Sequence, residues 1–161
     1  MTQECDYKYF TVYTDSLSSE SWIQGSQTDY VSHLTRPIKD VVEVSILNCS
    51  VDTTNSNVIY IKVDEFDNQF HVNSMNSSLQ YSPAGKGKTN GSLIRLNRSA
   101  ATGRTVYNQY DYDTNVEFTY PIRKVDRITT HVYNENGLPL TTTSNIFVTY
   151  KLKSKLENIC N

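Results

Sequence analysis

The sequence has no long hydrophobic run, and it has only three cysteines, a residue type that is abundant in small secreted proteins. No stretch of its 161 residues approaches the roughly 20 apolar residues of a membrane-spanning helix. The first residues lack the basic and apolar segments of a signal peptide, so we expect no secretion signal. Three cysteines, odd in number and far apart, favour free thiols in a reducing compartment, with a disulfide between Cys5 and Cys160 as the alternative.

Charge surplus and catalytic spacing are also missing. The formal net charge is −2, which lacks the basic surplus of a nucleic-acid-binding domain, so we expect no nucleic-acid partner. His33, His71 and His131 follow no metal-ligand spacing, and no Ser-His-Asp or Cys-His signature appears. We therefore expect no enzymatic activity, no metal and no cofactor.

One segment imitates a nucleotide-binding motif. Gly87-Lys88-Thr89 matches the end of a phosphate-binding loop, but Ser82 stands where the first glycine belongs. Such a loop also opens a helix whose N-terminus meets the phosphate, whereas residues 93–97 here alternate like a strand. We interpret this segment as a basic surface loop that does not bind nucleotides.

What the chain has in abundance is strand-forming sequence. It contains 12 Tyr and 5 Phe, and Thr, Val and Ile are frequent. In residues 37–66, apolar and polar side chains alternate on either side of a polar turn at 52–57, which predicts two half-buried strands. The same parity predicts a core that contains Val44, Ile46, Ile59, Ile61, Val148 and Tyr150.

Further strands complete an antiparallel fold. We expect Arg36-Pro37 to interrupt one strand and Pro121 to end another, and residues 15–29 to form a long loop. With turn signals between them, about eight strands indicate an all-β sandwich or barrel in one domain, residues 1–161. Besides 37–66, the predicted strands are 7–14, 30–34, 93–97, 105–110, 115–120, 124–134 and 144–152.

The ends and turns give further expectations. Asn136-Gly137 should be the hairpin tip that joins the last two strands, because this dipeptide tolerates positive φ. Residues 1–6 should form an N-terminal arm and residues 153–161 a polar C-terminal tail.

Two charged clusters have simple interpretations. An acidic cluster at the end of a predicted strand is interpreted as solvated, because a carboxylate pair needs a cleft to do acid–base work. A basic patch near the C-terminus is interpreted as blunting an edge strand, with contact to an acidic partner as the alternative. The acidic cluster is Asp64, Glu65 and Asp67, and the basic patch is Lys151, Lys153 and Lys155.

Two stretches carry a resemblance to a known family. The first has Asp29-Tyr30, Leu34 and Pro37-Ile38, then an alternating strand, and a second strand that closes on Glu65-Phe66. The second spans residues 120–138 and 145–152: a proline, an Asp-Arg-Ile strand, an Asn-Gly turn and a final strand that carries Phe147. Together they resemble the small single jelly-roll capsid proteins of large DNA viruses and virophages, in matching order. The final strand departs from the family's frequent His-Ser-Phe.

The resemblance implies an antiparallel, eight-stranded single jelly-roll β-sandwich with a structural role. It implies a minor capsid protein or penton subunit that is made in the host cytoplasm, forms homo-oligomers and packs against the major capsid protein in the virion. The alternative function is a carbohydrate- or receptor-binding sandwich such as a fibre head, with Trp22, Tyr110 and Tyr112 on one patch. Expected contact residues in the polar loops are Trp22, Lys86, Lys88, Arg98 and Arg104.

Overall fold

The described part of the chain is built almost entirely of β-strands. The computed structural model describes residues 6–17, 21–22, 28–52, 56–66, 89, 91–97, 104–108, 115–140 and 145–156. Its elements are β1 (Tyr7–Asp15), β2 (Ser21–Trp22), β3 (Asp29–Asp52), β4 (Val58–Val63), the 3-10 helix η2 (Asp64–Phe66), β5 (Ile94–Asn97), β6 (Arg104–Asn108), β7 (Val116–Asn134) and β8 (Phe147–Lys155).

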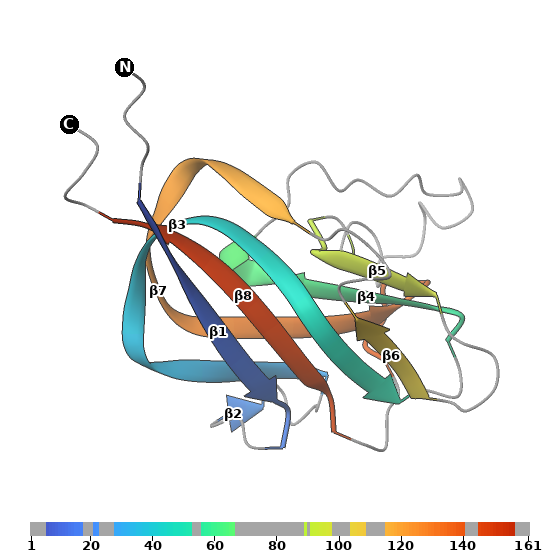
Figure 1. Cartoon of the computed structure of the whole chain (residues 1–161). Coiled ribbons are helices and arrows are strands. Elements are labelled where there is room, and N and C mark those ends of the chain that lie inside the picture. The colour runs from blue at the N-terminus through green and yellow to red at the C-terminus, as the bar shows by residue number, and fades with distance from the viewer. Residues whose placement is uncertain are drawn as a thin grey trace.

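The strands pair into one curled antiparallel sheet. Its order is β1-β8-β3-β7-β4-β5, and β2 and β6 also pair with β3. β3 has 24 residues and β7 has 19, so both strands run through the curl. Figure 1 shows β1, β8, β6 and the end of β3 in front, with β4, β5 and part of β7 behind. The predicted all-β, antiparallel, eight-stranded fold is confirmed, and the arrangement is consistent with a jelly-roll-like sandwich.

Prolines mark the places where β3 and β7 bend. The pairing of these two strands shifts register between His33 and Ile38 and again between Val41 and Glu43. Pro37 lies in the first irregularity of β3, and Pro121 lies in the β7 segment opposite the second. A proline is tolerated at a bulge because no ladder hydrogen bond is required there. The predicted interruptions at Arg36-Pro37 and Pro121 are therefore wrong: each proline bends a strand that continues past it.

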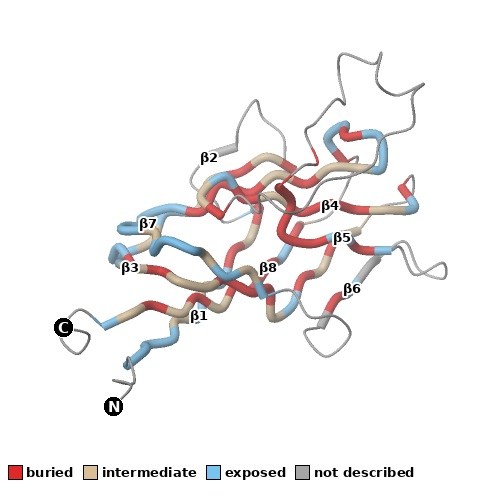
Figure 2. The backbone as a smooth tube through the Cα atoms, turned by 90° about the horizontal axis from the view of Figure 1, so that it is seen from above, coloured by how far each residue is buried: buried red, intermediate tan, exposed pale blue. Residues whose placement is uncertain are grey.

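The core lies between the two halves of the curled sheet. All six predicted core residues are buried, with at most 1% of their surface exposed. In Figure 2 the buried segments gather in the middle of the molecule, and β1 and the bends of β3 and β7 carry most of the exposed ones. The period-2 prediction of the core is therefore confirmed.

Buried hydroxyl groups connect strands that are not neighbours in the sheet. Thr14 Oγ1 in β1 lies 3.4 Å from the Tyr30 hydroxyl in β3, and Thr130 Oγ1 in β7 lies 3.2 Å from the Tyr150 hydroxyl in β8. Burial raises the pKa of Tyr30 to about 12, so this phenol stays neutral. These bonds give buried polar atoms partners and fix how the two halves face each other.

The turn after β7 has the predicted glycine but a different role. Gly137 has φ 71°, and its N–H donates to the Asn134 carbonyl at 3.0 Å. However, β7 pairs with β3 and β4, whereas β8 pairs with β1 and β3. The prediction that this turn is the hairpin tip of the last two strands is therefore wrong. The described residues just after the turn bond back to β7, through a bridge between Tyr133 and Pro139 and a hydrogen bond from Leu140 N to Val132 O.

Three smaller predictions also need correction. β2 lies inside the expected loop 15–29, where it pairs with the start of β3. The strand expected to run to Phe66 ends at Val63, because the chain turns into η2. β8 continues to Lys155, which pairs with Tyr7, so residues 153–155 are strand and not tail.

Replacing Ile61 with alanine should destabilise the fold by about 2–5 kcal/mol, because the substitution removes fully buried methyl groups and leaves a cavity. Urea unfolding measures this as a lower midpoint with an unchanged slope. Val106→Ala is the matched control, because Val106 is 59% exposed. It should change stability by only about 0.5 kcal/mol. Similar losses in both variants would contradict the assigned core.

Replacing Gly137 with valine should destabilise the fold by roughly 1–3 kcal/mol, because a β-branched residue is strained at positive φ. Gly137→Asn should cost less, since asparagine tolerates the left-handed region. Thermal unfolding of the two variants gives the comparison. Equal melting temperatures would show that the backbone conformation at this turn does not matter.

Candidate functional site

One cluster of titratable groups surrounds His131 in β7. Its Nδ1 lies 2.6 Å from Asp29 Oδ1 at the start of β3, and its Nε2 lies 3.1 Å from Asp64 Oδ2 in η2. The Tyr133 ring stacks on the imidazole at a centroid distance of 6.0 Å. The hydrogen bond to Asp29, aided by Asp64, raises the pKa of His131 above its usual value. The imidazolium form is thus stabilised by two carboxylates.

Glu65 attaches η2 to the same strand. Its carboxylate accepts hydrogen bonds from Thr129 N at 2.7 Å and Thr129 Oγ1 at 2.8 Å, and it pairs with Arg127 at 3.3 Å. The interpretation of this acidic cluster as a solvated strand end is therefore wrong for Glu65, whose side chain is only 17% exposed. Asp64 is 53% exposed, so it is solvated as expected although it also bonds to His131. Asp67 lies outside the described residues.

The His131 cluster has the composition of a catalytic site but not its geometry. A general base needs one ring nitrogen directed at a nucleophile, with the other held by an orienting group. Here both nitrogens of His131 face carboxylates. Within the described ranges, no group of His, Cys, Asp and Glu side chains could hold a metal ion. The cluster is therefore best suited to fastening η2 and the start of β3 to β7.

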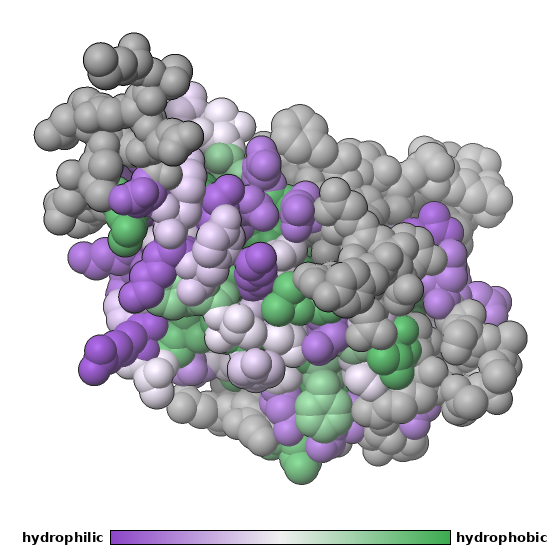
Figure 3. All heavy atoms as spheres, viewed as in Figure 1, coloured by the Kyte–Doolittle hydropathy of each residue, from purple (hydrophilic) through white to green (hydrophobic). Residues whose placement is uncertain are grey.

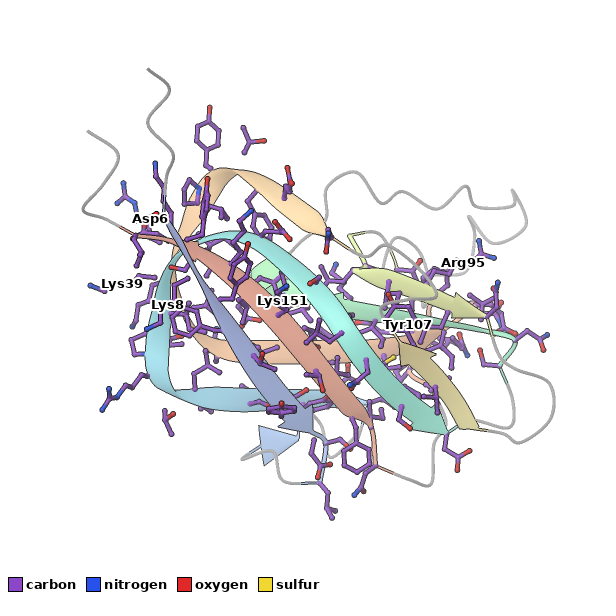
Figure 4. All side chains as sticks on the ribbon, in the orientation of Figure 1. Asp6, Lys8, Lys39, Arg95, Tyr107 and Lys151 are labelled. Carbon is purple, nitrogen blue, oxygen red and sulfur yellow. The ribbon has the colours of Figure 1, made fainter. Side chains whose placement is uncertain are left out.

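The second candidate is an outer surface of β1 and β8, here called the Tyr–Lys face. Lys153 Nζ lies 4.5 Å from the centroid of the Tyr7 ring, and Lys151 Nζ lies 4.7 Å from that of Tyr9. Lys153 also pairs with Glu43 of β3 at 3.3 Å. Figure 3 shows purple and pale side chains over these strands, and Figure 4 labels Lys151 on β8. The Tyr–Lys face consists of Tyr7, Tyr9, Tyr13, Lys151, Lys153 and Lys155.

A groove lies at one end of the Tyr–Lys face. It has a volume of about 370 Å³ and lies between the paired ends of β1 and β8 and the bend of β7. Glu43 and Glu117 bring negative charge to its lining, and Lys153 and Lys155 bring positive charge. Such a mixed lining can receive a polar side chain of a partner and discriminates by charge placement.

The Tyr–Lys face was not predicted as a site, although its signal is present in the sequence. Tyr7, Tyr9 and Tyr13 share one parity, and they are 43%, 54% and 79% exposed. An outward row of aromatics on a strand can therefore be read from residues 7–13. The lysine patch was assigned to an edge strand, and this is wrong, because β8 pairs on both sides, with β1 and β3.

The side chains of the residues predicted as loop contacts all lie outside the described part of the structure. Trp22 belongs to β2 and Arg104 begins β6, but their side chains lie outside the described part. Lys86, Lys88 and Arg98 also lie outside it, as do Tyr110 and Tyr112 of the alternative patch. The strand expected after the glycine-rich loop is β5.

The thiol of Cys49 is buried in β3, and burial raises its pKa to about 12, which leaves it neutral.

Comparison with known proteins finds no matching family model and no matching curated protein. None of the helices in the described ranges has the length and apolar character to cross a membrane.

His131→Gln should change how stability depends on pH. Because the folded-state pKa of His131 is raised, its stabilisation is fully present below the unfolded value of about 6.5 and is lost as pH rises through the folded pKa. As pH rises from about 6.5 through the folded pKa, the wild type should therefore lose free energy of unfolding relative to His131→Gln.

Urea unfolding at several pH values from about 5 to 9 measures this difference. Asp29→Asn should reduce the difference, because it removes the largest cause of the raised pKa. Parallel pH profiles for the wild type and His131→Gln would show that protonation of His131 does not contribute to the stability of the fold.

Proposed function

We propose that the protein is a non-enzymatic structural subunit of a virus shell, a minor capsid protein or penton subunit that packs against major capsid proteins in the virion. The proposal rests on the positions in the fold of the two stretches that resemble single jelly-roll capsid proteins. Residues 28–66 form β3, β4 and η2, and residues 120–152 include most of β7 and β8. These elements supply the middle of the curled sheet, so the resemblance covers the framework of the domain and not its loops alone.

The described surface also favours assembly over chemistry. Both ring nitrogens of His131 are bonded to carboxylates, so this histidine has no nitrogen directed at a nucleophile. The Tyr–Lys face instead presents large aromatic rings whose positions are set by neighbouring lysines. Exposed tyrosines supply contact area at a low entropic cost, and rim charges orient a partner.

A shell subunit acts through repetition. Identical contacts repeated around symmetry axes close into a shell, so each interface can be modest on its own. A stable interface of ordinary size buries about 1,200–2,000 Å² in total. The Tyr–Lys face and the groove beside it lie over strands of the framework, so they provide a rigid contact surface.

A carbohydrate-binding sandwich is the second candidate. The observation that favours it is the row of exposed tyrosines, because sugar rings pack on aromatic faces and hydroxyls bond to polar neighbours such as Lys151 and Lys153. The two candidates predict different behaviour of the purified protein. A shell subunit should co-purify with a major shell protein, whereas a glycan binder should retain sugar on an array without such a partner.

The double variant Tyr7→Ser/Tyr9→Ser should reduce incorporation into particles by about tenfold, because it removes ring area from the Tyr–Lys face. Val106→Ser is the control, since Val106 is 59% exposed on β6, which pairs with β3 and not with β1 or β8. Quantitative mass spectrometry of purified virions gives the ratio to the major shell protein.

The predicted loop contacts are tested in the same assay. Replacing Lys86, Lys88, Arg98 and Arg104 together by glutamate should keep the fold and lower incorporation, because loop charges orient neighbours more than they stabilise the chain. Normal incorporation would remove those loops from the contact surface. Absence of the wild-type protein from purified virions would overturn the proposed function itself.

A further inference from the structure

Within the described part of the chain, β1 forms an edge of the sheet. It ends the strand order, and of the strands in the described ranges only β8 pairs with it. Its nine residues, Tyr7–Asp15, contain no proline or glycine and keep one register with β8 throughout. Monomeric proteins usually protect an edge of this length with a bulge, a proline or several charges, whereas β1 has only Lys8 and Asp15, near its two ends. A long regular edge is therefore a template for another strand.

The hydrogen bonds at its two ends show which backbone groups face outward. Leu156 N donates to Asp6 O, and Ser16 N donates to Ile146 O, both at 3.0 Å. Because the register between these bonds does not shift, even-numbered residues exchange hydrogen bonds with β8. The N–H and C=O groups of Tyr7, Tyr9, Thr11 and Tyr13 therefore point to the edge of the sheet.

The side chains along β1 also indicate a missing neighbour. Phe10 and Val12 pack against the core but are only partly buried, because the sheet stops at their strand. On the other side of the strand, Tyr9 and Tyr13 are 54% and 79% exposed. One added strand would cover apolar surface on both sides of the sheet.

We propose that β1 pairs antiparallel with β1 of a second copy of this chain, around a two-fold axis at Thr11. In this register the two strands overlap over their full length, and Tyr9, Thr11 and Tyr13 lie in hydrogen-bonded pairs. Thr11 then faces Thr11 of the second copy, and Phe10 faces Val12. Tyr9 faces Tyr13, an aromatic pair of the kind that stabilises antiparallel strands.

Charge placement agrees with a self-complementary edge. Lys8 and Asp15 are the charged residues of β1, and in this register they face Thr14 and Tyr7, so no like charges meet. The β8 lysines of the two copies are separated by both β1 strands, about 14 Å across the sheet. This exceeds the Debye length of about 8 Å at physiological salt, so their repulsion is largely screened. The inference goes beyond the proposed function and does not depend on it.

The purified chain tests the pairing directly. Sedimentation equilibrium at tens of micromolar protein should give a dimer for the wild type. Thr11→Lys and Thr11→Asp should each raise the dissociation constant by about tenfold or more, because each variant places like charges face to face. An equal mixture of the two variants should form a heterodimer, since the charges then attract. A monomeric wild type, or a mixture that stays as weak as its components, would overturn the proposal.

Crosslinking gives a second measurement that does not depend on charge. In a background with Cys5→Ser and Cys160→Ser, Thr11→Cys should form a disulfide-linked dimer on mild oxidation, because paired Cα atoms lie about 5.5 Å apart. Tyr13→Cys is the matched control. Its two copies would lie about 13 Å apart along the strands, so it should not crosslink.

Equal crosslinking of Thr11→Cys and Tyr13→Cys would contradict the register. A chain that stays monomeric alone and gains a strand only from another protein would contradict pairing between copies. Either failure would leave the virion assay above unaffected, so the two proposals fail separately.

Discussion

The pairing of β3 with β7 is the constraint on which the rest of the structure depends. These two strands are bonded to each other on both sides of the bends. Every other strand in the described part pairs with one of them, or with β8 or β4, which themselves pair with β3 and β7. Because both bend at the same pair of register shifts, the sheet folds over itself and encloses one core. Asp40, with φ 50°, occupies the left-handed region at this bend, where aspartate is tolerated better than most residues.

Polar bonds determine how the two halves meet. The apolar core would allow small shifts of one layer over the other, because hydrophobic contacts have no direction. The bonds from Thr14 to Tyr30 and from Thr130 to Tyr150 have direction, and each spans the interior. At the periphery, the His131 and Glu65 interactions attach η2 to β7 in the same directional manner. The positions of the layers are thus specified by a few buried or half-buried polar contacts.

The curl also decides which surfaces are available. It leaves β1 at the end of the described sheet, where β1 carries aromatic side chains on its outer surface and directs backbone groups of Tyr7, Tyr9, Thr11 and Tyr13 outward. The groove beside the Tyr–Lys face exists because the bend of β7 comes close to the ends of β1 and β8. The proposed structural role and the proposed self-association would both use this region.

The sequence by itself determined the all-β class and the core residues through alternation, and the glycine turn through the Asn136-Gly137 dipeptide. The inward rows of Ile59 and Ile61, and of Val148 and Tyr150, depend only on the period of a strand, which is local. The effects of Pro37 and Pro121 could not be read locally, because a proline ends a strand unless the partner strand shifts register opposite it.

Only the tertiary structure decided that β8 is internal, that β1 is the edge, and that His131 meets Asp29 and Asp64. The physical reason is that strand order and long-range polar contacts depend on which distant segments pair. The pattern of a single strand does not contain this information.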